Sequence, residues 1–118
     1  MKKLMIVDDE VSNLELFSEI FEDDSIQIEC CTSGEEALKT YNQFQPEVII
    51  LDIMMPGMDG FDVCQKIKSL TSDPKIIMVS GMAGSEVEQR AKTSGCDRFY
   101  LKPVNIFTLR DEVLQTES

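Results

Sequence analysis

Val48-Ile49-Ile50-Leu51 is the most hydrophobic run of this 118-residue chain, and Asp52 follows it directly. Every residue of the run is apolar, whereas a strand with one face in water would alternate apolar and polar side chains. Strands that are covered on both faces are typical of the middle of a parallel sheet. The run therefore predicts a central, buried strand with Asp52 at its carboxyl end.

Apolar runs and amphipathic stretches alternate along the rest of the chain. The pattern predicts strands over 4–7, 26–31, 48–51, 76–79 and 99–101, and helices over 11–22, 33–44, 61–70, 84–94 and from 105 onward. Strict alternation of strands and helices implies right-handed crossovers and a parallel sheet with helices on both faces. We therefore predict an α/β fold, a doubly wound, five-stranded parallel sheet, with residues 1–118 as one domain.

Local signals mark the ends of several predicted helices. Ser33 with Glu36 three residues later is a capping-box pattern. Gly95 can end the helix over 84–94, and Asn105 can begin the last helix as its N-cap. The apolar face of 84–94 is thin, which favours a weakly anchored helix. The helix over 61–70 is expected to bury a stripe of Phe61, Cys64, Ile67 and Leu70.

The composition narrows the classes of partner. The chain has 22 acidic and 11 basic residues, a net charge of −11, and 42% hydrophobic residues. Such a charge argues against direct binding to nucleic acid or to an anionic membrane, because phosphates would be repelled. No run approaches the ~18 apolar residues of a membrane span, and the N-terminal apolar run is too short for a signal peptide.

The cysteines indicate a reducing environment. Cys30, Cys31, Cys64 and Cys96 form no C-x-x-C pair and the chain has no histidine, so a zinc site is not expected. We expect four free thiols that pack as small apolar side chains, with Cys30 and Cys31 on opposite faces of their strand. These expectations favour a cytoplasmic protein.

Polar residues follow four of the predicted strands. Asp8 and Asp9 follow the first strand, Asp52 the third, Ser80 the fourth and Lys102 the fifth. The carboxyl ends of parallel strands meet at one edge of a sheet, where open α/β folds bind their ligands. Two carboxylates about 4 Å apart repel by roughly 1 to 4 kcal/mol, which a hard divalent cation such as Mg²⁺ would relieve. The pattern therefore predicts a Mg²⁺ site with oxygen ligands.

The same residues suit phosphoryl transfer. Asp52 is the candidate nucleophile, because a carboxylate can accept a phosphoryl group and form an aspartyl phosphate. Lys102 can pair with phosphoryl oxygens, and Ser80 can donate a hydrogen bond to one of them. Taken singly, each residue is more simply explained as a turn residue, a helix cap or a solvated charge. Their coincidence at four strand ends favours a phosphoryl site.

On these motifs the chain resembles the receiver domains of two-component response regulators. The matching segments are Asp8-Asp9, Leu51-Asp52-Ile53-Met54-Met55-Pro56-Gly57-Met58-Asp59-Gly60, Ser80-Gly81 and Leu101-Lys102-Pro103. The resemblance implies a flavodoxin-like (βα)5 fold with strand order 2-1-3-4-5. It also implies a signalling switch rather than an enzyme, although a switch that catalyses its own phosphotransfer and autodephosphorylation.

The resemblance implies a donor for Asp52 and ligands for the metal. Asp52 would accept a phosphoryl group from a phosphohistidine on a sensor histidine kinase or a phosphotransfer protein. Mg²⁺ would be held by Asp9, Asp52 and the backbone carbonyl of Met54. Asp8 would reach the metal through a water molecule.

The resemblance also implies how the switch responds. Ser80 and Lys102 would contact the phosphoryl group, and Tyr100 would swing inward when Ser80 moves. The Lys102-Pro103 peptide bond is expected to be cis. The responding surface would bind an unidentified output protein, and a homodimer formed on phosphorylation is left open. This surface would comprise 84–94, 99–101 and the helix from 105 onward.

Two other functions are weighed against this one. A Mg²⁺-dependent phosphatase of the haloacid dehalogenase type also uses an aspartate at a strand end, but it needs a second aspartate two residues later, where this chain has Met54. A receiver-like scaffold that is never phosphorylated would not need the intact site.

Ser80 stands where threonine is commoner in the family, and Met54 and Met82 could shield the phosphoryl group from water.

Overall fold

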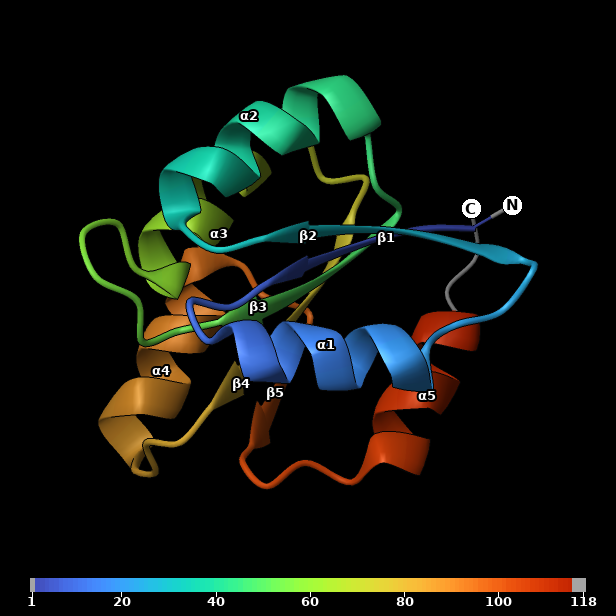
Figure 1. The fold of residues 1–118 in the computed structure, drawn as a ribbon. Coiled ribbons are helices and arrows are strands. Elements are labelled where there is room, and N and C mark those ends of the chain that lie inside the picture. Colours follow the sequence, from blue (N-terminus) through green and yellow to red (C-terminus); the bar gives the residue numbers. More distant parts are fainter. Residues whose placement is uncertain (1, 116–118) are drawn as a thin grey trace.

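The computed structural model describes residues 2–115, which form five strands and five helices in strict alternation (Figure 1). The strands are β1 (Lys2–Val7), β2 (Ile26–Cys31), β3 (Val48–Asp52), β4 (Lys75–Ser80) and β5 (Arg98–Leu101). The helices are α1 (Val11–Ile20), α2 (Gly34–Phe44), α3 (Gly60–Leu70), α4 (Ser85–Ser94) and α5 (Ile106–Leu114). All the predicted elements are present. Within residues 2–115, no helix combines the length and the apolar character that crossing a membrane requires.

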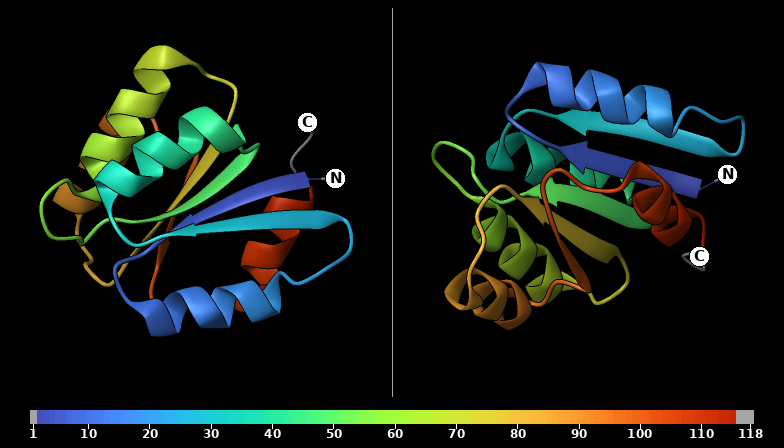
Figure 2. Two further views of the ribbon diagram at one scale, coloured as in Figure 1. Left: turned by 45° about the horizontal axis from the view of Figure 1, so that its top comes forward. Right: turned by 90° about the horizontal axis from the view of Figure 1, so that it is seen from below.

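The five strands form one parallel sheet in the order β2-β1-β3-β4-β5. The predicted fold class and strand order are therefore confirmed. α1 and α5 pack on one face of the sheet, and α2, α3 and α4 pack on the other (Figure 2). β1 and β3 are neighbours, with Val7 opposite Leu51. Their carboxyl ends therefore lie side by side near the centre of the sheet.

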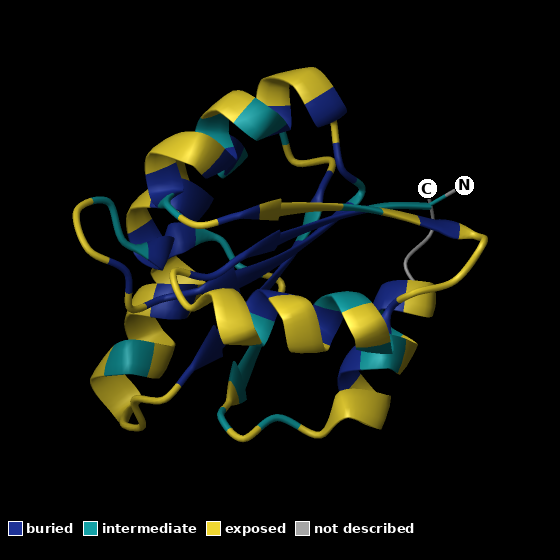
Figure 3. Cartoon of the chain, in the orientation of Figure 1, coloured by how far each residue is buried: buried dark blue, intermediate teal, exposed yellow. Residues whose placement is uncertain are grey.

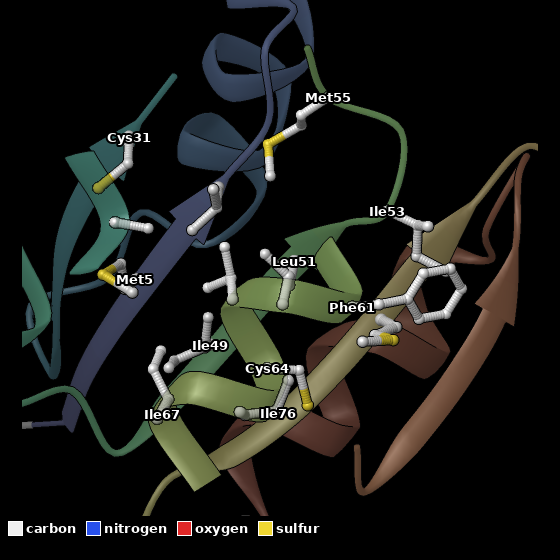
Figure 4. Close-up of a cluster of buried hydrophobic side chains, with 14 of the residues drawn as sticks. Met5, Cys31, Ile49, Leu51, Ile53, Met55, Phe61, Cys64, Ile67 and Ile76 are labelled. Carbon is white, nitrogen blue, oxygen red and sulfur yellow. The ribbon is translucent and has the colours of Figure 1, made fainter. Parts of the chain in front are cut away.

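β3 is buried along its whole length, as its unbroken apolar run predicts. Ile49 and Leu51 belong to the apolar cluster under α2 and α3, which Figure 4 shows. Val48 and Ile50 belong to the second cluster, under α1 and α5. Burial of apolar surface on both faces is the main stabilising contribution to such a strand. It also fixes the position of Asp52 at the end of the strand.

Two of the predicted packing positions are wrong. Leu70 extends the apolar stripe of α3, but its side chain is 71% exposed because the helix ends at this residue. Cys30 is exposed on the edge strand β2, so it does not pack as a small apolar side chain. Its neighbour Cys31 is buried, which confirms that the two point to opposite faces. All four cysteines are free thiols, as predicted.

Hydrogen bonds confirm the predicted helix ends. Ser33 Oγ accepts a backbone N–H of the first turn of α2 at 3.1 Å, and Asn105 Oδ1 accepts two from the first turn of α5. Gly95 ends α4 in the left-handed conformation, with φ 100°. Only Ala91 and Ser94 of α4 are buried, and the helix is exposed over most of its length (Figure 3). α4 is thus the weakly anchored helix that its sequence predicts.

Glu112 ties α5 to two strands of the sheet. Its Oε2 pairs with the ammonium group of Lys75 on β4. Its Oε1 accepts hydrogen bonds from Arg98 Nε at 3.1 Å and from the Tyr100 hydroxyl at 2.9 Å, both on β5. The hydrogen bond from Lys75 is the main cause that lowers the pKa of Glu112 from 4.5 to about 2. The ionised carboxylate therefore stabilises the folded state.

We predict that Glu112→Gln lowers the free energy of unfolding by about 1 to 2 kcal/mol at neutral pH, because these charge-assisted bonds are lost near the surface. A carboxyl with a lowered folded-state pKa stabilises fully above its unfolded-state pKa, and this stabilisation is lost as the pH falls through the folded-state value. The difference between the unchanged protein and the variant should therefore shrink from about pH 5 to about pH 2 in denaturant titrations.

Glu86→Gln, on the exposed first turn of α4, is the matched control for this prediction. It removes the same charge without removing these contacts, so it should change the stability little at any pH. A Glu112→Gln difference as large at about pH 3 as at neutral pH would contradict the role of the ionised carboxylate.

Candidate functional site

Three aspartates meet at the carboxyl edge of the sheet. Asp8 and Asp9 follow β1, and Asp52 ends β3, the strand beside β1. One carboxylate oxygen from each residue lies within 4.8 Å of the other two. Asp8 and Asp52 are 2% and 5% exposed, whereas Asp9 is open to solvent. The carboxylates thus converge as the sequence predicts.

Asp8 is oriented by the chain that follows it. Its Oδ1 accepts the backbone N–H of Glu10 at 2.9 Å, and its Oδ2 accepts the side-chain amide of Asn13 at 3.1 Å. Sequence reasoning missed Asn13. One sequence signal was available for this contact. Asn13 is a polar residue in the first turn of an amphipathic helix, five residues after Asp8, and a side chain at that position can reach back to the end of the strand.

Lys102 places a cation between two of the carboxylates. Its Nζ lies 3.4 Å from Asp52 Oδ1 and 3.6 Å from Asp8 Oδ2. Its backbone N–H donates to the carbonyl of Ser80 at 2.7 Å, which joins the end of β5 to the end of β4. The Lys102-Pro103 peptide bond is cis, as predicted.

The environment of Asp52 disfavours its ionised form. Burial and the nearby Asp8 carboxylate raise the pKa of Asp52 from 3.8 to about 6, although the Lys102 ammonium opposes this shift. At neutral pH the Asp52 carboxyl is therefore ionised at a cost in folding free energy. The site carries more negative charge than its lysine offsets.

Ser80 ends β4 with a fully buried side chain. Its Oγ accepts the backbone N–H of Met82 at 2.9 Å, which leaves the hydroxyl hydrogen for another acceptor. Asp52 pairs with Val79 in the register of β3 and β4, so Ser80 lies one residue further along the neighbouring strand. Ser80 therefore lies at the same edge of the sheet as the aspartates.

Gly60 lets α3 begin directly beside the end of β3. Its backbone N–H donates to the carbonyl of Ile53 at 2.9 Å. A Cβ atom on Gly60 would lie 2.5 Å from the carbonyl oxygen of Asp52, closer than any side chain allows. Glycine is therefore required here, and the loop over 53–59 is folded back next to the carboxylates.

A cleft of about 500 Å³ opens beside this loop. Met54 and Met82, which are 55% and 38% exposed, line it from two different loops. Arg90 of α4 also lines the cleft, with its guanidinium carbon 4.2 Å from the centroid of the Phe61 ring. The two methionines that the sequence analysis names therefore line one cleft, which lies between the β3–α3 loop and α4.

Tyr100 is half-buried on β5 and packs at the border of the cluster under α1 and α5. Its hydroxyl donates to Glu112 Oε1, which holds the ring toward α5. Sequence reasoning missed Glu112 as a partner, because it is one of several acidic residues on an amphipathic helix and no local pattern distinguishes it.

The donor atoms of the site fit Mg²⁺. The cluster of Asp8, Asp9 and Asp52 offers carboxylate oxygens, which hard divalent cations prefer, whereas zinc favours nitrogen and sulfur ligands. Two of the carboxylates are buried, and Lys102 offsets only part of their charge. A divalent cation bound here would relieve the remaining repulsion.

A family model described as "Response regulator receiver domain" matches residues 4–114. The chain belongs to this family. It is a receiver domain of two-component response regulators, a family of signalling switches that interact with histidine kinases or phosphotransfer proteins.

Individual relatives agree with this assignment. The chain is 39% identical over 106 residues to the "Heme response regulator HssR" of Staphylococcus epidermidis, covering 90% of this chain and 47% of that protein. The chain thus spans about half the length of this curated relative. Its fold is similar to a CheY-like receiver domain protein from Methanospirillum hungatei, with a TM-score of 0.91, 28% identity, and coverage of 98% of this chain and 92% of that one.

A second solved structure is a complex described as CheX-CheY-BeF3-Mg+2, from Borrelia burgdorferi. The matched chain of that complex has a TM-score of 0.87 and 26% identity, covering 96% of this receiver domain and 87% of the matched chain.

We predict that Asp52→Asn stabilises the receiver domain by about 1 to 3 kcal/mol in EDTA near pH 7.5, because it removes a buried charge whose pKa is raised. The cost of ionising Asp52 is absent below its unfolded-state pKa and complete above its folded-state value of about 6. Denaturant titrations should therefore show the difference closing as the pH falls toward about 4.

Asp24→Asn, in an exposed turn after α1, is the control, because it removes an aspartate outside the cluster. An Asp52→Asn variant that is no more stable than the unchanged protein in EDTA would mean that Lys102 already compensates the charge of Asp52.

Proposed function

We propose that this receiver domain is a phosphorylation-controlled switch in which Asp52 accepts the phosphoryl group. The phosphodonor would be a phosphohistidine on a sensor histidine kinase or a phosphotransfer protein. The observation that carries the proposal is the convergence of Asp8, Asp9 and Asp52 beside Lys102 at one edge of the sheet. Asp52 is buried, and its carboxylate lies 3.4 Å from the Lys102 ammonium group, which can pair with phosphoryl oxygens.

The transfer itself is a substitution at phosphorus. An oxygen of the Asp52 carboxylate forms the new P–O bond while the P–N bond to the donor imidazole breaks. The imidazole nitrogen keeps the electron pair of the broken bond and takes up a proton. The product is an aspartyl phosphate on this chain and a neutral histidine on the donor.

We propose that Asp9, Asp52 and the backbone carbonyl of Met54 hold Mg²⁺, with Asp8 acting through water. The oxygen donors of the aspartates and the Mg²⁺ named in the description of the Borrelia burgdorferi complex support this assignment. When bound, the ion supplies positive charge that offsets the repulsion between the carboxylates and an incoming phosphoryl group.

Lys102 and Ser80 are suited to hold the phosphoryl group once it is attached. Lys102 already lies within 3.6 Å of two carboxylates, and a phosphoryl group on Asp52 would offer its ammonium group a stronger anionic partner. Ser80 keeps its hydroxyl hydrogen for a phosphoryl oxygen, because the hydroxyl acts as an acceptor toward Met82. Loss of the Asp52–Lys102 pair and gain of these bonds would distinguish the two states.

The responding surface would be formed by α4, β5 and α5. Movement of Ser80 toward the phosphoryl group would make room for Tyr100 to swing inward, which requires release of its hydroxyl from Glu112. α4 has few buried residues to resist a shift. This surface would bind an output protein or a second copy of the chain.

We place the protein in the cytoplasm, and we propose that water ends the signal by hydrolysing the aspartyl phosphate.

Asp52→Asn should abolish labelling of the protein by acetyl phosphate in Mg²⁺, because the amide is a far weaker nucleophile than the carboxylate. Intact-protein mass spectrometry would measure the labelling. Asp24→Asn should be labelled like the unchanged protein, since this residue lies outside the aspartate cluster. Labelling of Asp52→Asn at the unchanged level would remove Asp52 from its proposed role.

Mg²⁺ should raise the stability of the unmodified protein. At ten times its dissociation constant, one bound ion adds about 1.4 kcal/mol to the free energy of unfolding. Thermal melts in Mg²⁺ and in EDTA would measure the difference, with Asp24→Asn as a control that should respond normally. Identical melts in both conditions would count against the metal site.

A further inference from the structure

Among residues 2–115, Asn13 makes the one side-chain hydrogen bond from α1 to the aspartate cluster. It lies in the first turn of α1 and is half-buried. Its amide nitrogen Nδ2 donates to Asp8 Oδ2 at 3.1 Å, while the backbone N–H of Glu10 donates to Oδ1 at 2.9 Å. The two carboxylate oxygens of Asp8 are thus held from two directions by neighbouring parts of the chain.

The Asp8 oxygen that Asn13 contacts is also the Asp8 oxygen that pairs with Lys102. Lys102 Nζ lies 3.6 Å from Asp8 Oδ2 and 3.4 Å from Asp52 Oδ1. If Asn13 did not donate to Oδ2, only the hydrogen bond from Glu10 to Oδ1 would orient the Asp8 carboxylate, and Oδ2 would be able to approach the ammonium group more closely. The closer ion pair would neutralise part of the charge that attracts a divalent cation, and it would draw Lys102 away from Asp52.

The chemical nature of the Asn13 side chain matters for this arrangement. An amide is a neutral donor, so it orients the carboxylate without cancelling its charge. A lysine or arginine in its place would orient Asp8 equally well but would compete with the cation. Groups that orient metal-binding carboxylates in this way commonly alter metal affinity by 10- to 100-fold when they are removed.

We infer that Asn13 is a positioning residue that holds the Asp8 carboxylate in the orientation required for Mg²⁺ binding and prevents a closer ion pair with Lys102. The inference rests on the proposed function, because it assumes that the aspartate cluster binds Mg²⁺. Asn13 itself is not a ligand of the ion and acts through Asp8.

Isothermal titration of the metal-free protein with MgCl₂ tests the inference. Asn13→Ala and Asn13→Leu both remove the donor, and leucine keeps nearly the shape of asparagine. Both variants should raise the Mg²⁺ dissociation constant about tenfold. Asn42→Ala, on the exposed surface of α2, is the matched control and should leave the constant unchanged. An Asn13→Leu or Asn13→Ala constant within about twofold of the unchanged protein would overturn the inference.

A double-mutant cycle separates an effect through Asp8 from a general effect on the fold. In the Asp8→Asn background, adding Asn13→Ala should change the dissociation constant less than about twofold, since the positioned carboxylate is gone. A tenfold effect that persists in this background would show that Asn13 acts elsewhere and would overturn the inference. Thermal melts in EDTA would show that each variant is folded.

The same titration distinguishes this inference from the proposal on which it rests. If the unchanged protein bound no Mg²⁺, the proposed function would fail, and this inference would fail with it. If the unchanged protein bound Mg²⁺ while Asn13→Ala bound it equally well, only the role of Asn13 would be wrong.

Discussion

Repulsion between buried carboxylates at the end of the sheet is the constraint on which the rest of the structure depends. The apolar faces of β1 and β3 are buried, which brings their polar ends together whether or not the charges there are compensated. Asp8 and Asp52 are consequently held close, with Lys102 as a partial counterion. The free energy gained by packing the apolar core offsets the cost of this arrangement.

The elements around the site differ in how firmly they are held. β3 is buried throughout, and the close approach of Gly60 leaves the start of α3 little freedom. α4, on the same side of the sheet as α3, buries only Ala91 and Ser94. A change of charge at the carboxyl edge therefore acts on two kinds of neighbour. β3 and the start of α3 are firmly held, whereas α4 is loosely held. The least anchored neighbour is expected to respond first.

The sequence was sufficient for the features that local patterns determine. The unbroken run of β3, the cap at Ser33 and the left-handed Gly95 each depend on a few adjacent residues, and the structure has all of them. The convergence of the aspartates was also predictable, because the topology of a parallel sheet brings the strand ends together.

Features that depend on distant parts of the chain were harder to predict. The exposure of Leu70 depends on where α3 ends, and that of Cys30 on β2 lying at the edge of the sheet. The contact of Glu112 with Tyr100 depends on how α5 lies across β5. The inward movement of Tyr100 and the metal contact of the Met54 carbonyl stay predictions, because both concern a state with a bound group.

The hydrogen bond from the backbone N–H of Lys102 to the carbonyl of Ser80 couples the two strand ends. A shift of the main chain at either residue therefore strains this bond as well as the β4–β5 ladder next to it. Substituting either side chain leaves that mechanical link in place, so its removal would require altering the peptide unit itself.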